Sequence, residues 1–535
     1  MHEPRFPVPA VEYAAQQPAA DAGWFWGICE SRPEKVAVVD VDGTEISFGE
    51  LGRRVNQISH GFAASGVGPG ECVTVALKNR ADFLALKLAA GQSGVYLVPA
   101  GVHSTRRELA HVIGDSKSRL VFADEVSMEA AVGASDEHGV ENARLVMMDP
   151  LGGRRSMADF LRGLPTSTPE SRVGGRYMYY TSGTTGSPKG VVVPATPKSP
   201  EEDTAAWAAG FASSFDFVPF EGVHLVTGPL YHRGPGLWTL VSLHLGHTVV
   251  LMRKFDPETM LGLIQRYRVT SSHIVPTVFH RMLQIPLEVR EQYDLSSLRQ
   301  VLHAAAPCPV HVKRAMIAWL GPVLWEYYGS TEGGGTIVRP EDFEQHPGSQ
   351  GRAWPGAKVR ITDDARQPVP AGVEGTIWIS NGTRFSYRGD ETKTRAAWDG
   401  EWFTVGDIGH LDPDGWLYIG DRRSDLIISG GVNVYPAEVE GALLAHPLVA
   451  DAAVVGVPDD EWGQRVVAVI EPRPEAPESD SLAEELTRHC RAELTGPKVP
   501  REYCFVSVMP RNEIGKVSRT GLRDNLLART MEERS

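Results

Sequence analysis

The feature that most constrains the fold of this 535-residue chain is an alternation of apolar runs and amphipathic segments over its first 330 residues. Four runs have the length and composition of buried strands: residues 73–77, 95–99, 120–123 and 145–148. Apolar residues at 51, 55, 58 and 62 are spaced as on one helix face, and 83–90 predicts a second helix. Strands that alternate with helices pair in parallel, so the sequence predicts an α/β fold.

The same rhythm returns between residues 223 and 328, which predicts a second sheet-bearing subdomain, each of the two being of αβαβα type. From 359 to 410, short strands with glycine turns predict a small β-rich subdomain. Residues 420–424 are charged and turn-rich, as is typical of a domain boundary. We therefore expect a large N-terminal domain at 1–421, a hinge at 422–424, and a small, mobile α+β C-terminal domain at 425–535.

Residues 179–193 are crowded with hydroxyl side chains and interleaved with glycines. Glycine lets the backbone approach a ligand closely, and successive backbone N–H groups in such a loop form a concave anion site. Pro188 precedes Lys189 and a β-branched run follows, unlike the nucleotide loop that enters a helix directly. We predict a phosphate-binding loop between two strands; the alternative is a solvated linker. The Pro/Ser/Glu-rich residues 194–203 are expected to form a loop.

Composition limits the class of partner. The formal net charge of −14 and the pI near 5.7 argue against nucleic acid or an anionic membrane as a general partner. The five cysteines are far apart and include no Cys-x-x-Cys pair, so we expect a reducing, cytoplasmic compartment. We expect neither a signal peptide nor a membrane span, because no basic segment precedes an apolar core and no apolar run is long enough.

Three further segments each look like half of a site. Tyr-Gly-Ser-Thr-Glu at 328–332 ends a strand with hydroxyls and a carboxylate, which suits a divalent cation bridging to phosphate; a helix N-cap is the alternative. Asp407, which lies between glycines, and Arg422 are suited to binding a ribose diol; the alternative is a turn aspartate and a surface arginine. The segment Pro-Arg-Asn-Glu-Ile-Gly-Lys at 510–516 ends in Lys516, which is a candidate site residue; the alternative is a solvated basic tail.

Taken together, these segments resemble the adenylate-forming superfamily of acyl-CoA synthetases, peptide-synthetase adenylation domains and luciferases, across essentially the whole chain. The resemblance is carried by five segments in order: Tyr-Thr-Ser-Gly-Thr-Thr-Gly-Ser-Pro-Lys-Gly at 180–190, Tyr-Gly-Ser-Thr-Glu at 328–332, Thr-Val-Gly-Asp at 404–407, residues 421–440, and Gly-Lys-Val at 515–517. It implies a two-step reaction. A carboxylate attacks the α-phosphate of Mg-ATP to give acyl-AMP and pyrophosphate; the C-terminal domain then rotates and a thiol, usually of CoA, attacks the acyl-AMP.

The resemblance also implies roles by position. The nucleotide would contact Thr181, Ser182, Gly183, Thr184, Thr185, Gly186, Lys189, Ala305, Ala306, Pro307, Tyr327, Tyr328, Gly329, Ser330, Asp407, Ile419 and Arg422. Thr331 would bind the α-phosphate, Glu332 the Mg²⁺, and Lys516 would bridge the carboxylate and the α-phosphate. Ser429, Gly430 and Gly431 would form the CoA-binding loop. The hinge residue is Ser424, where the family commonly has Asp or Lys, and this departure bears on the thioester step.

The acyl pocket is expected at Tyr231, His232, Gly234, Gly236, Trp238, Ala304 and Gly329. No acidic residue occurs between Arg233 and Phe255, so a buried substrate amine would lack a partner. Small residues predict room for a bulky acid, and the run Pro-Leu-Tyr-His-Arg-Gly-Pro at 229–235 resembles synthetases for long-chain, steroid-side-chain or other polycyclic acids. Aromatic lining, for which Trp238 is the candidate, would favour an aryl acid. His232 is a candidate catalytic residue. We expect it to gate the pocket or to pack beside the carboxylate of the substrate; a structural role is the alternative.

The leading hypothesis is thus an AMP-forming acid–thiol ligase that uses ATP, Mg²⁺ and CoA. One alternative is an adenylating enzyme that delivers the acyl group to a carrier protein or partner enzyme. Another is a non-catalytic nucleotide-binding module, against which Lys516 and Glu332 count. If the chain associates with itself, we expect a homodimer.

Overall fold

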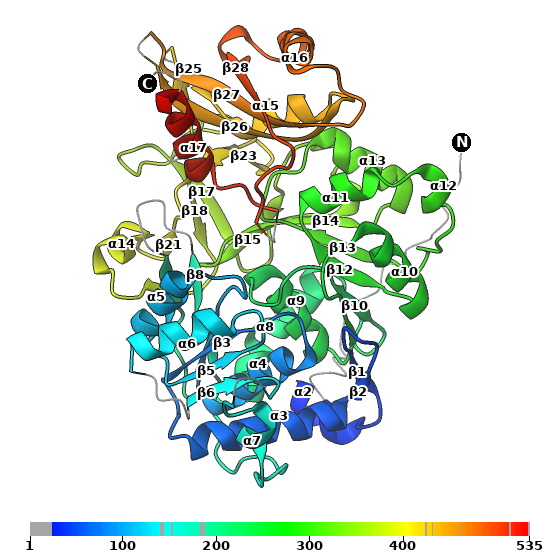
Figure 1. Cartoon of the computed structure of the whole chain (residues 1–535), viewed down its shortest axis with the longest axis vertical. Coiled ribbons are helices and arrows are strands. Elements are labelled where there is room, and N and C mark those ends of the chain that lie inside the picture. Colours follow the sequence, from blue (N-terminus) through cyan, green and yellow to red (C-terminus); the bar gives the residue numbers. More distant parts are fainter. Residues whose placement is uncertain are drawn as a thin grey trace.

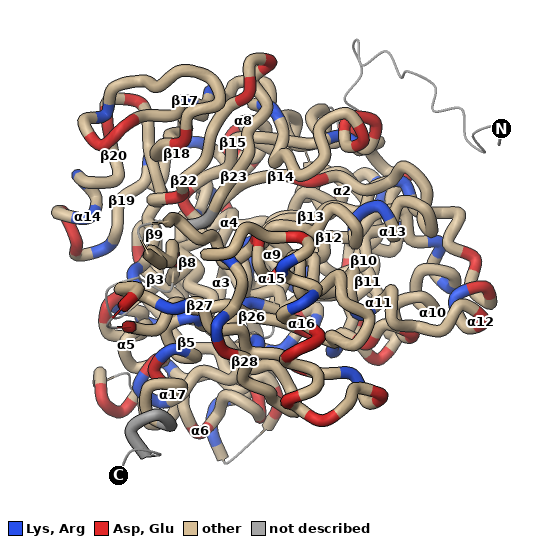
Figure 2. The backbone as a smooth tube through the Cα atoms, turned by 90° about the horizontal axis from the view of Figure 1, so that it is seen from above, with Lys and Arg blue, Asp and Glu red and all other residues tan. Residues whose placement is uncertain are grey.

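The computed structural model describes residues 24–139, 144–150, 153–181, 188–422, 425–430, 432–459, 461–512 and 515–532. Two sheet-bearing units, in blue to green, form the lower and middle parts of Figure 1, and a smaller orange and red domain covers the top. This arrangement confirms the α/β class, with a large N-terminal domain of mixed sheets and a small C-terminal domain. Charged residues of both signs are interspersed along the chain rather than gathered by sign (Figure 2).

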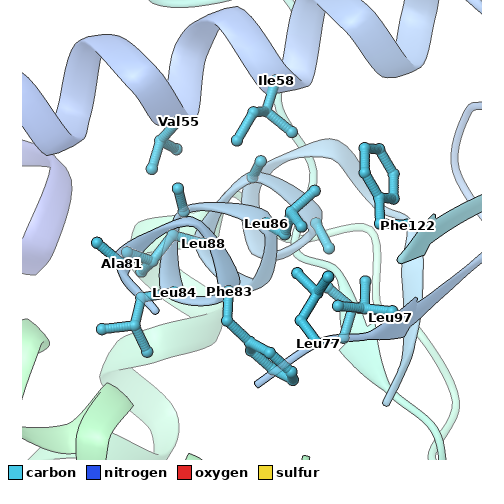
Figure 3. Close-up of a cluster of buried hydrophobic side chains, with 14 of the residues drawn as sticks. Val55, Ile58, Leu77, Ala81, Phe83, Leu84, Leu86, Leu88, Leu97 and Phe122 are labelled. Atoms are coloured by element: carbon cyan, nitrogen blue, oxygen red, sulfur yellow. The ribbon is translucent and has the colours of Figure 1, made fainter. Parts of the chain in front are cut away.

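The first sheet is parallel, with strand order β6-β5-β3-β4-β7. Its elements are β3 Cys72–Ala76, β4 Tyr96–Pro99, β5 Leu120–Ala123, β6 Leu145–Met147, β7 Arg176–Tyr177, α3 Phe48–Ala64, α4 Ala81–Ser93, α5 Arg106–Ser116, α6 Met128–Glu137 and α7 Met157–Leu161. Helix α4 is apolar on all sides, because it lies between α3 and the sheet. Figure 3 shows Val55 and Ile58 of α3 on one side of it and Leu77 and Leu97 on the other.

The second sheet has nine strands in the order β16-β15-β14-β13-β12-β10-β11-β1-β2. Its strands are β1 Val36–Val39, β2 Glu45–Ser47, β10 Val223–Val226, β11 Thr248–Leu251, β12 Ser271–Ile274, β13 Gln300–His303, β14 Leu324–Gly329, β15 Gly334–Val338 and β16 Arg352–Ala353. The strands from β1 to β14 in this order are parallel, and only the edges are antiparallel. The carboxyl ends of β10, β12, β13 and β14 therefore meet at one edge, where ligands bind in open α/β sheets.

The helices of this unit are α2 Trp24–Ser31, α8 Pro200–Ser214, α9 Arg233–His244, α10 Pro257–Tyr267, α11 Pro276–Leu283, α12 Leu287–Arg290 and α13 Val310–Leu320, with the 3-10 turn η2 Pro340–Asp342. Residues 194–199 form the expected loop, but α8 corrects our expectation for residues 200–203. Ser199 accepts from the backbone N–H of Glu202, whose side chain accepts in return, and Pro200 occupies the first helical position. This capping box fixes the helix start within a segment whose composition resembles a loop.

Two smaller sheets connect these units to the C-terminal domain. The hairpin strands β8 Tyr179–Thr181 and β9 Lys189–Val192 pair antiparallel with each other, and β9 pairs with β19 Ser386–Tyr387. The β-rich subdomain contains β17 Lys358–Thr362, β18 Gly375–Ser380, β20 Trp398–Asp399, β21 Trp402–Phe403, β22 Asp407–Leu411 and β23 Leu417–Arg422, with α14 Glu391–Ala396.

The C-terminal domain consists of β24 Ile427–Ser429, β25 Val432–Val434, β26 Val449–Asp459, β27 Gly463–Pro472, β28 Glu502–Phe505, α15 Pro436–Leu444, α16 Ser479–Glu493, α17 Arg519–Glu532 and the 3-10 turn η3 Gly496–Lys498. It contacts the N-terminal domain through Tyr435, whose hydroxyl donates to Glu374 at 2.5 Å, and through His280, whose Nε2 lies 2.6 Å from the carbonyl of Ala450. Among the described helices, none combines the length and apolar character needed to cross a bilayer.

Candidate active site

The hydroxyl-rich hairpin is held in place from both of its strands. Thr181 pairs with Lys189, which confirms that strands flank the loop on both sides. The Tyr180 hydroxyl donates to Asp115 Oδ2 at 2.6 Å, and His111 Nε2 lies 2.7 Å from the carbonyl of Pro188. Because the strand ends are anchored to α5, both ends of the loop between them are held in place. The predicted phosphate ligands Ser182, Gly183, Thr184, Thr185 and Gly186 lie outside the described residues.

The segment after β14 is a tight turn and not a helix start, which excludes the N-cap alternative. Ser330 N–H donates to the carbonyl of Gly333 at 2.6 Å, and the Ser330 hydroxyl accepts from the backbone N–H of Glu332 at 3.2 Å. The chain then returns as β15. Thr331 and Glu332 thus lie at the tip of a hairpin, at the carboxyl end of the parallel part of the sheet.

Tyr328 and Asp407 come together across two subdomains. The Tyr328 hydroxyl donates to Asp407 Oδ2 at 2.6 Å, and Asp407 is 7% exposed. Asp407 is also the register partner of Arg422, because β22 and β23 are antiparallel; only the backbone of Arg422 is described. Ile419 lies on the same strand, opposite Gly409. The structure therefore places the expected adenine and ribose groups side by side.

Tyr327 corrects our assignment to the nucleotide set. Successive side chains on a strand point to opposite faces, so Tyr327 faces away from Asp407. Its hydroxyl accepts from Trp238 Nε1 at 3.1 Å and lies 3.0 Å from His273 Nε2. Its side chain therefore contacts Trp238, a residue of the expected acyl pocket, rather than Asp407.

The acyl side is more aromatic and less open than expected. Trp238 is fully buried behind Tyr327, and its ring lies 4.7 Å from that of Phe215 in an edge-on arrangement. The space that Gly234 and Gly236 leave is already filled: a Cβ at Gly234 would lie 2.6 Å from the His273 ring, and one at Gly236 would lie 2.4 Å from Lys87 Nζ. These glycines provide room for neighbouring side chains, so the expectation of open space beside them is wrong. Tyr231, whose ring lies 4.6 Å from that of His232, is nearly buried, as is Ala304.

The loop after β13 carries backbone strain at Ala305. Ala304 is buried, whereas Ala305, Ala306 and Pro307 are exposed. Ala305 has a φ of 76°, a left-handed conformation that favours glycine and costs other residues roughly 1–2 kcal/mol. Strained residues of this kind cluster at ligand sites.

Replacing Ala305 with glycine is therefore expected to raise the free energy of unfolding by about 1 kcal/mol, because glycine adopts positive φ without steric cost. Ala306→Gly is the matched control: Ala306 itself has no positive φ, so the glycine there should be neutral or destabilising by up to about 1 kcal/mol. Urea unfolding of both variants measures the difference. Equal midpoints for the two would contradict the strain at residue 305.

Tyr387 is a site residue that the sequence did not indicate. Its buried hydroxyl donates to Glu332 Oε1 at 2.8 Å. Tyr387 belongs to β19, which pairs with the hairpin strand β9, so one residue connects the phosphate hairpin to the expected metal ligand. The signal in the sequence was weak, since a lone tyrosine within 384–388 carries no recognisable pattern.

The buried carboxylate of Glu332, 6% exposed, fits a Mg²⁺ ion that is held jointly by protein and substrate. Mg²⁺ is commonly bound by one or two carboxylates together with substrate phosphates. Among the described residues, no group of three or more His, Cys, Asp or Glu side chains could hold a metal by itself. The donor set at this site therefore suits a metal–nucleotide complex rather than a resident metal.

Three further polar residues lie at the base of the hairpin: Lys87 of α4, Tyr179 of β8 and Arg233 of α9. Lys87 Nζ donates to the Tyr179 hydroxyl at 3.0 Å, and burial lowers the pKa of Lys87 to about 7. Arg233 Nη1 donates to the carbonyl of Thr331. Burial lowers the pKa of Arg233, while the neighbouring Tyr179, Glu332 and Tyr327 raise it. A lysine inside the apolar run 83–90 was the one available sequence signal.

Lys516 of the C-terminal domain approaches His232 of the N-terminal domain. Burial, together with the charge of Lys516, lowers the pKa of His232 to about 4, so the ring is neutral near pH 7. Gly515 lies against α11, since a Cβ there would be 2.1 Å from Thr277 Oγ1. In Figure 1 the red segment before α17 descends towards β14 and β15. Two residues that are distant in sequence therefore share the site.

The expected CoA-binding loop lies elsewhere. Ser429 is buried, and Gly430, at a φ of 58°, packs against Trp462, in the turn between β24 and β25. Figure 1 shows β25 at the far end of the C-terminal domain from β14 and β15. Gly431 and the hinge residue Ser424 lie outside the described residues.

Comparisons with known proteins agree with this geometry. The family model of the AMP-binding enzyme matches residues 25–386, and that of the AMP-binding enzyme C-terminal domain matches 438–516. A long-chain-fatty-acid–CoA ligase of Mycobacterium tuberculosis is 31% identical over 495 residues, which cover 90% of this chain and 93% of the relative. A fatty acid–acyl-carrier-protein ligase of Streptomyces coeruleorubidus is 29% identical over 502 residues, with coverages of 90% and 92%. An anthranilate CoA ligase, solved in complex with anthranoyl-AMP, superposes with a TM-score of 0.84 at 26% identity, covering 95% of this chain and 98% of that one.

Proposed function

The chain belongs to the AMP-binding enzyme family, and from this premise we propose that it activates a hydrophobic carboxylic acid with ATP and transfers the acyl group to a thiol. The acid is first converted to acyl-AMP with release of pyrophosphate, and CoA then takes the acyl group as a thioester. Named relatives include ligases that use CoA and one that uses an acyl-carrier protein, so a carrier protein is the alternative acceptor.

The single observation that carries the proposal is that the segment bearing Lys516 reaches the N-terminal domain: a Cβ at Gly515 would lie 2.1 Å from Thr277 Oγ1, and Lys516 is near His232, whose neighbour Arg233 donates to the carbonyl of Thr331. A lone ammonium group delivered from a second domain suits a reaction between two anions. The carboxylate and the α-phosphate repel each other, and a cation placed between them lowers the energy of attack. His232 is neutral there, so its proposed role is packing beside the carboxylate rather than general acid catalysis.

We assign the nucleotide by position. The hairpin residues Thr181 to Lys189 would hold the β- and γ-phosphates through backbone N–H groups, hydroxyls and one cation. Ala305, Ala306 and Tyr328 would face the adenine, and Asp407 with Arg422 the ribose. The hydrogen bond from Tyr328 to Asp407 supports a shared adenosine site. Thr331 would contact the α-phosphate, and bound Mg²⁺ at Glu332 would neutralise charge on the phosphate oxygens.

Domain rotation separates the two half-reactions in this proposal. We place the domains at 1–421 and 425–535, with the hinge at 422–424. In the present arrangement Lys516 is near His232, whereas β25 lies at the far end of the C-terminal domain from β14 and β15. Rotation about the hinge would withdraw the lysine and bring the β24–β25 turn to the acyl-AMP. The same domain thus serves adenylation and thioester formation in turn.

The aromatic wall supports an aryl or other flat hydrophobic acid over a bulkier one. Trp238, Phe215 and Tyr327 form edge-on contacts, and the glycine spaces beside them are filled. The solved relative named for anthranilate is consistent with a ring-bearing acid. The free cysteines, five in the described residues, support a cytoplasmic location.

A pyrophosphate-release screen tests the function. Fatty, aryl, steroid and terpenoid acids, including decanoate and trans-cinnamate, are each supplied with Mg-ATP, with and without CoA. We expect acid-dependent release, highest with aryl acids, and thioester formation only with CoA. Acid-dependent release without a CoA thioester would favour a carrier protein, and no acid-dependent release would support a non-catalytic nucleotide-binding module.

Tyr387→Phe provides a prediction for the metal site. Removing the hydroxyl that orients Glu332 is expected to raise the half-saturating Mg²⁺ concentration about 10- to 100-fold, the usual effect of losing a partner of a metal-binding carboxylate. Tyr293→Phe is the matched control, because it removes a tyrosine–glutamate hydrogen bond at an exposed position, from Tyr293 to Glu258 at 3.1 Å. If both variants keep the wild-type Mg²⁺ requirement, Tyr387 does not position the metal ligand.

A further inference from the structure

Lys87 is a fully buried cation without an anionic partner among the described residues. It lies at 0% exposure on α4, between Leu86 and Leu88, and the one hydrogen bond described for its side-chain amine goes to the Tyr179 hydroxyl at 3.0 Å. An isolated buried charge is costly. Replacing it with an apolar residue would remove this cost, so its presence requires a benefit elsewhere.

That benefit is the orientation of the Tyr179 hydroxyl. Because Lys87 donates to the tyrosine oxygen, the tyrosine's own proton points elsewhere. Burial raises the pKa of Tyr179, so this hydroxyl keeps its proton. No described residue accepts that proton, and Tyr179, unlike Lys87, is partly exposed. Tyr179 is therefore a prepared hydrogen-bond donor at the base of the phosphate hairpin.

Arg233 supplies further donors at the same place. It lies one helical turn before Gly236 on α9, and a Cβ at Gly236 would be 3.1 Å from the Tyr179 hydroxyl, so Arg233 and Gly236 share the face that meets Tyr179. One of the five guanidinium N–H groups goes to the carbonyl of Thr331, and no acceptor for the others occurs among the described residues. Arg233 is also partly exposed.

We propose that Arg233 and Tyr179, whose hydroxyl is oriented by Lys87, form an oxyanion site that binds the carboxylate of the acid substrate before adenylation; this inference rests on the proposed ligase function. A guanidinium and a hydroxyl donor together match the two oxygens of a carboxylate. The site adjoins Thr331 and Glu332, where the acid must meet the α-phosphate. Arg233 and Tyr179 hold the carboxylate in the ground state, and Lys516 acts on it during attack.

Acid affinity measured by titration calorimetry, and KM values from acid-dependent ATP–pyrophosphate exchange, test the site with trans-cinnamate and decanoate as probes. Arg233→Met is expected to weaken acid binding about 10- to 100-fold and Tyr179→Phe about 3- to 10-fold, with the KM for ATP changed less than about threefold. Arg233→Lys should recover part of the loss. Arg268→Met, at an exposed arginine paired with Asp294, is the control and should change neither value.

One further variant and one further ligand exclude a merely structural role. Lys87→Met preserves shape and removes the buried charge; it should raise the melting temperature and yet weaken acid binding a few-fold. The methyl ester of trans-cinnamate has no carboxylate anion, so Arg233→Met should change its affinity less than about threefold.

The outcomes separate the two proposals. A wild type that shows no acid-dependent exchange contradicts the ligase function. A wild type that exchanges, but whose acid affinity is unchanged in Arg233→Met and Tyr179→Phe, overturns the oxyanion site alone. A rise in the KM for ATP or in the Mg²⁺ requirement, with acid binding unchanged, would assign Arg233 to the phosphates and overturn the carboxylate assignment.

Discussion

Replacing Lys516 with alanine is expected to lower acid-dependent pyrophosphate release about 100- to 1000-fold, because the reaction centre loses the cation that offsets repulsion between carboxylate and α-phosphate. The thioester step with supplied acyl-AMP should be nearly unchanged, since the proposed domain rotation would withdraw the lysine before that step begins. Pyrophosphate release and CoA-dependent consumption of acyl-AMP, measured on the same preparation, check both halves of the prediction.

Lys498→Ala is the matched control for this variant. Lys498 also lies on the C-terminal domain, but it forms a surface ion pair with Glu438 at 2.7 Å, away from the segment before α17 that carries Lys516. Its loss should leave both half-reactions near wild-type rates. Retained pyrophosphate release in Lys516→Ala, or an equal loss in both half-reactions, would refute the assigned role of Lys516.

Acidification from pH 7 to pH 5 is expected to destabilise the N-terminal domain by several kcal/mol. Burial lowers the pKa of five histidines to values of about 3 to 4: His224, His232, His244, His247 and His273. In the unfolded chain they take up protons below about pH 6.5. Below about pH 6.5 the unfolded state therefore binds more protons than the folded state. The contribution of these histidines to the free energy of unfolding is fully present above about pH 6.5 and is lost as the pH falls towards about 4. Each group contributes about 1.4 kcal/mol per pH unit in that window.

Urea unfolding as a function of pH measures this linkage. His244→Phe, which fills a site surrounded by Trp26 and Phe25, should reduce the protons taken up on unfolding at pH 5 by about one. His138→Gln removes an exposed histidine and should leave the slope unchanged. Stability that is constant or rising between pH 7 and pH 5 would contradict the buried neutral histidines.

Much of the fold was predictable because the strand–helix alternation is local. The parallel sheets and the hairpin strands around the phosphate loop follow from periodicity and turn residues within a few positions. Helix α8 was missed because the capping box at Ser199 was outweighed by a loop-like composition. Local rules conflicted there, and side-chain capping decided the outcome.

The site was only partly predictable, because its decisive contacts are distant in sequence. Lys87 meets Tyr179 across 92 residues, and Tyr387 meets Glu332 across 55. Gly234 and Gly236 read as empty space in the sequence, yet side chains from other elements fill that space. The motif residues Tyr328 and Asp407 were identified because each stands in a recognisable segment; their partners lacked such a segment.

A crystal structure grown with Mg²⁺ and a non-hydrolysable ATP analogue tests the central claim most directly. We predict adenine against Ala305 and Tyr328, the ribose at Asp407, and the phosphates between the hairpin 181–189 and Glu332. Nucleotide density away from both the hairpin and the end of β14 would contradict the account as a whole.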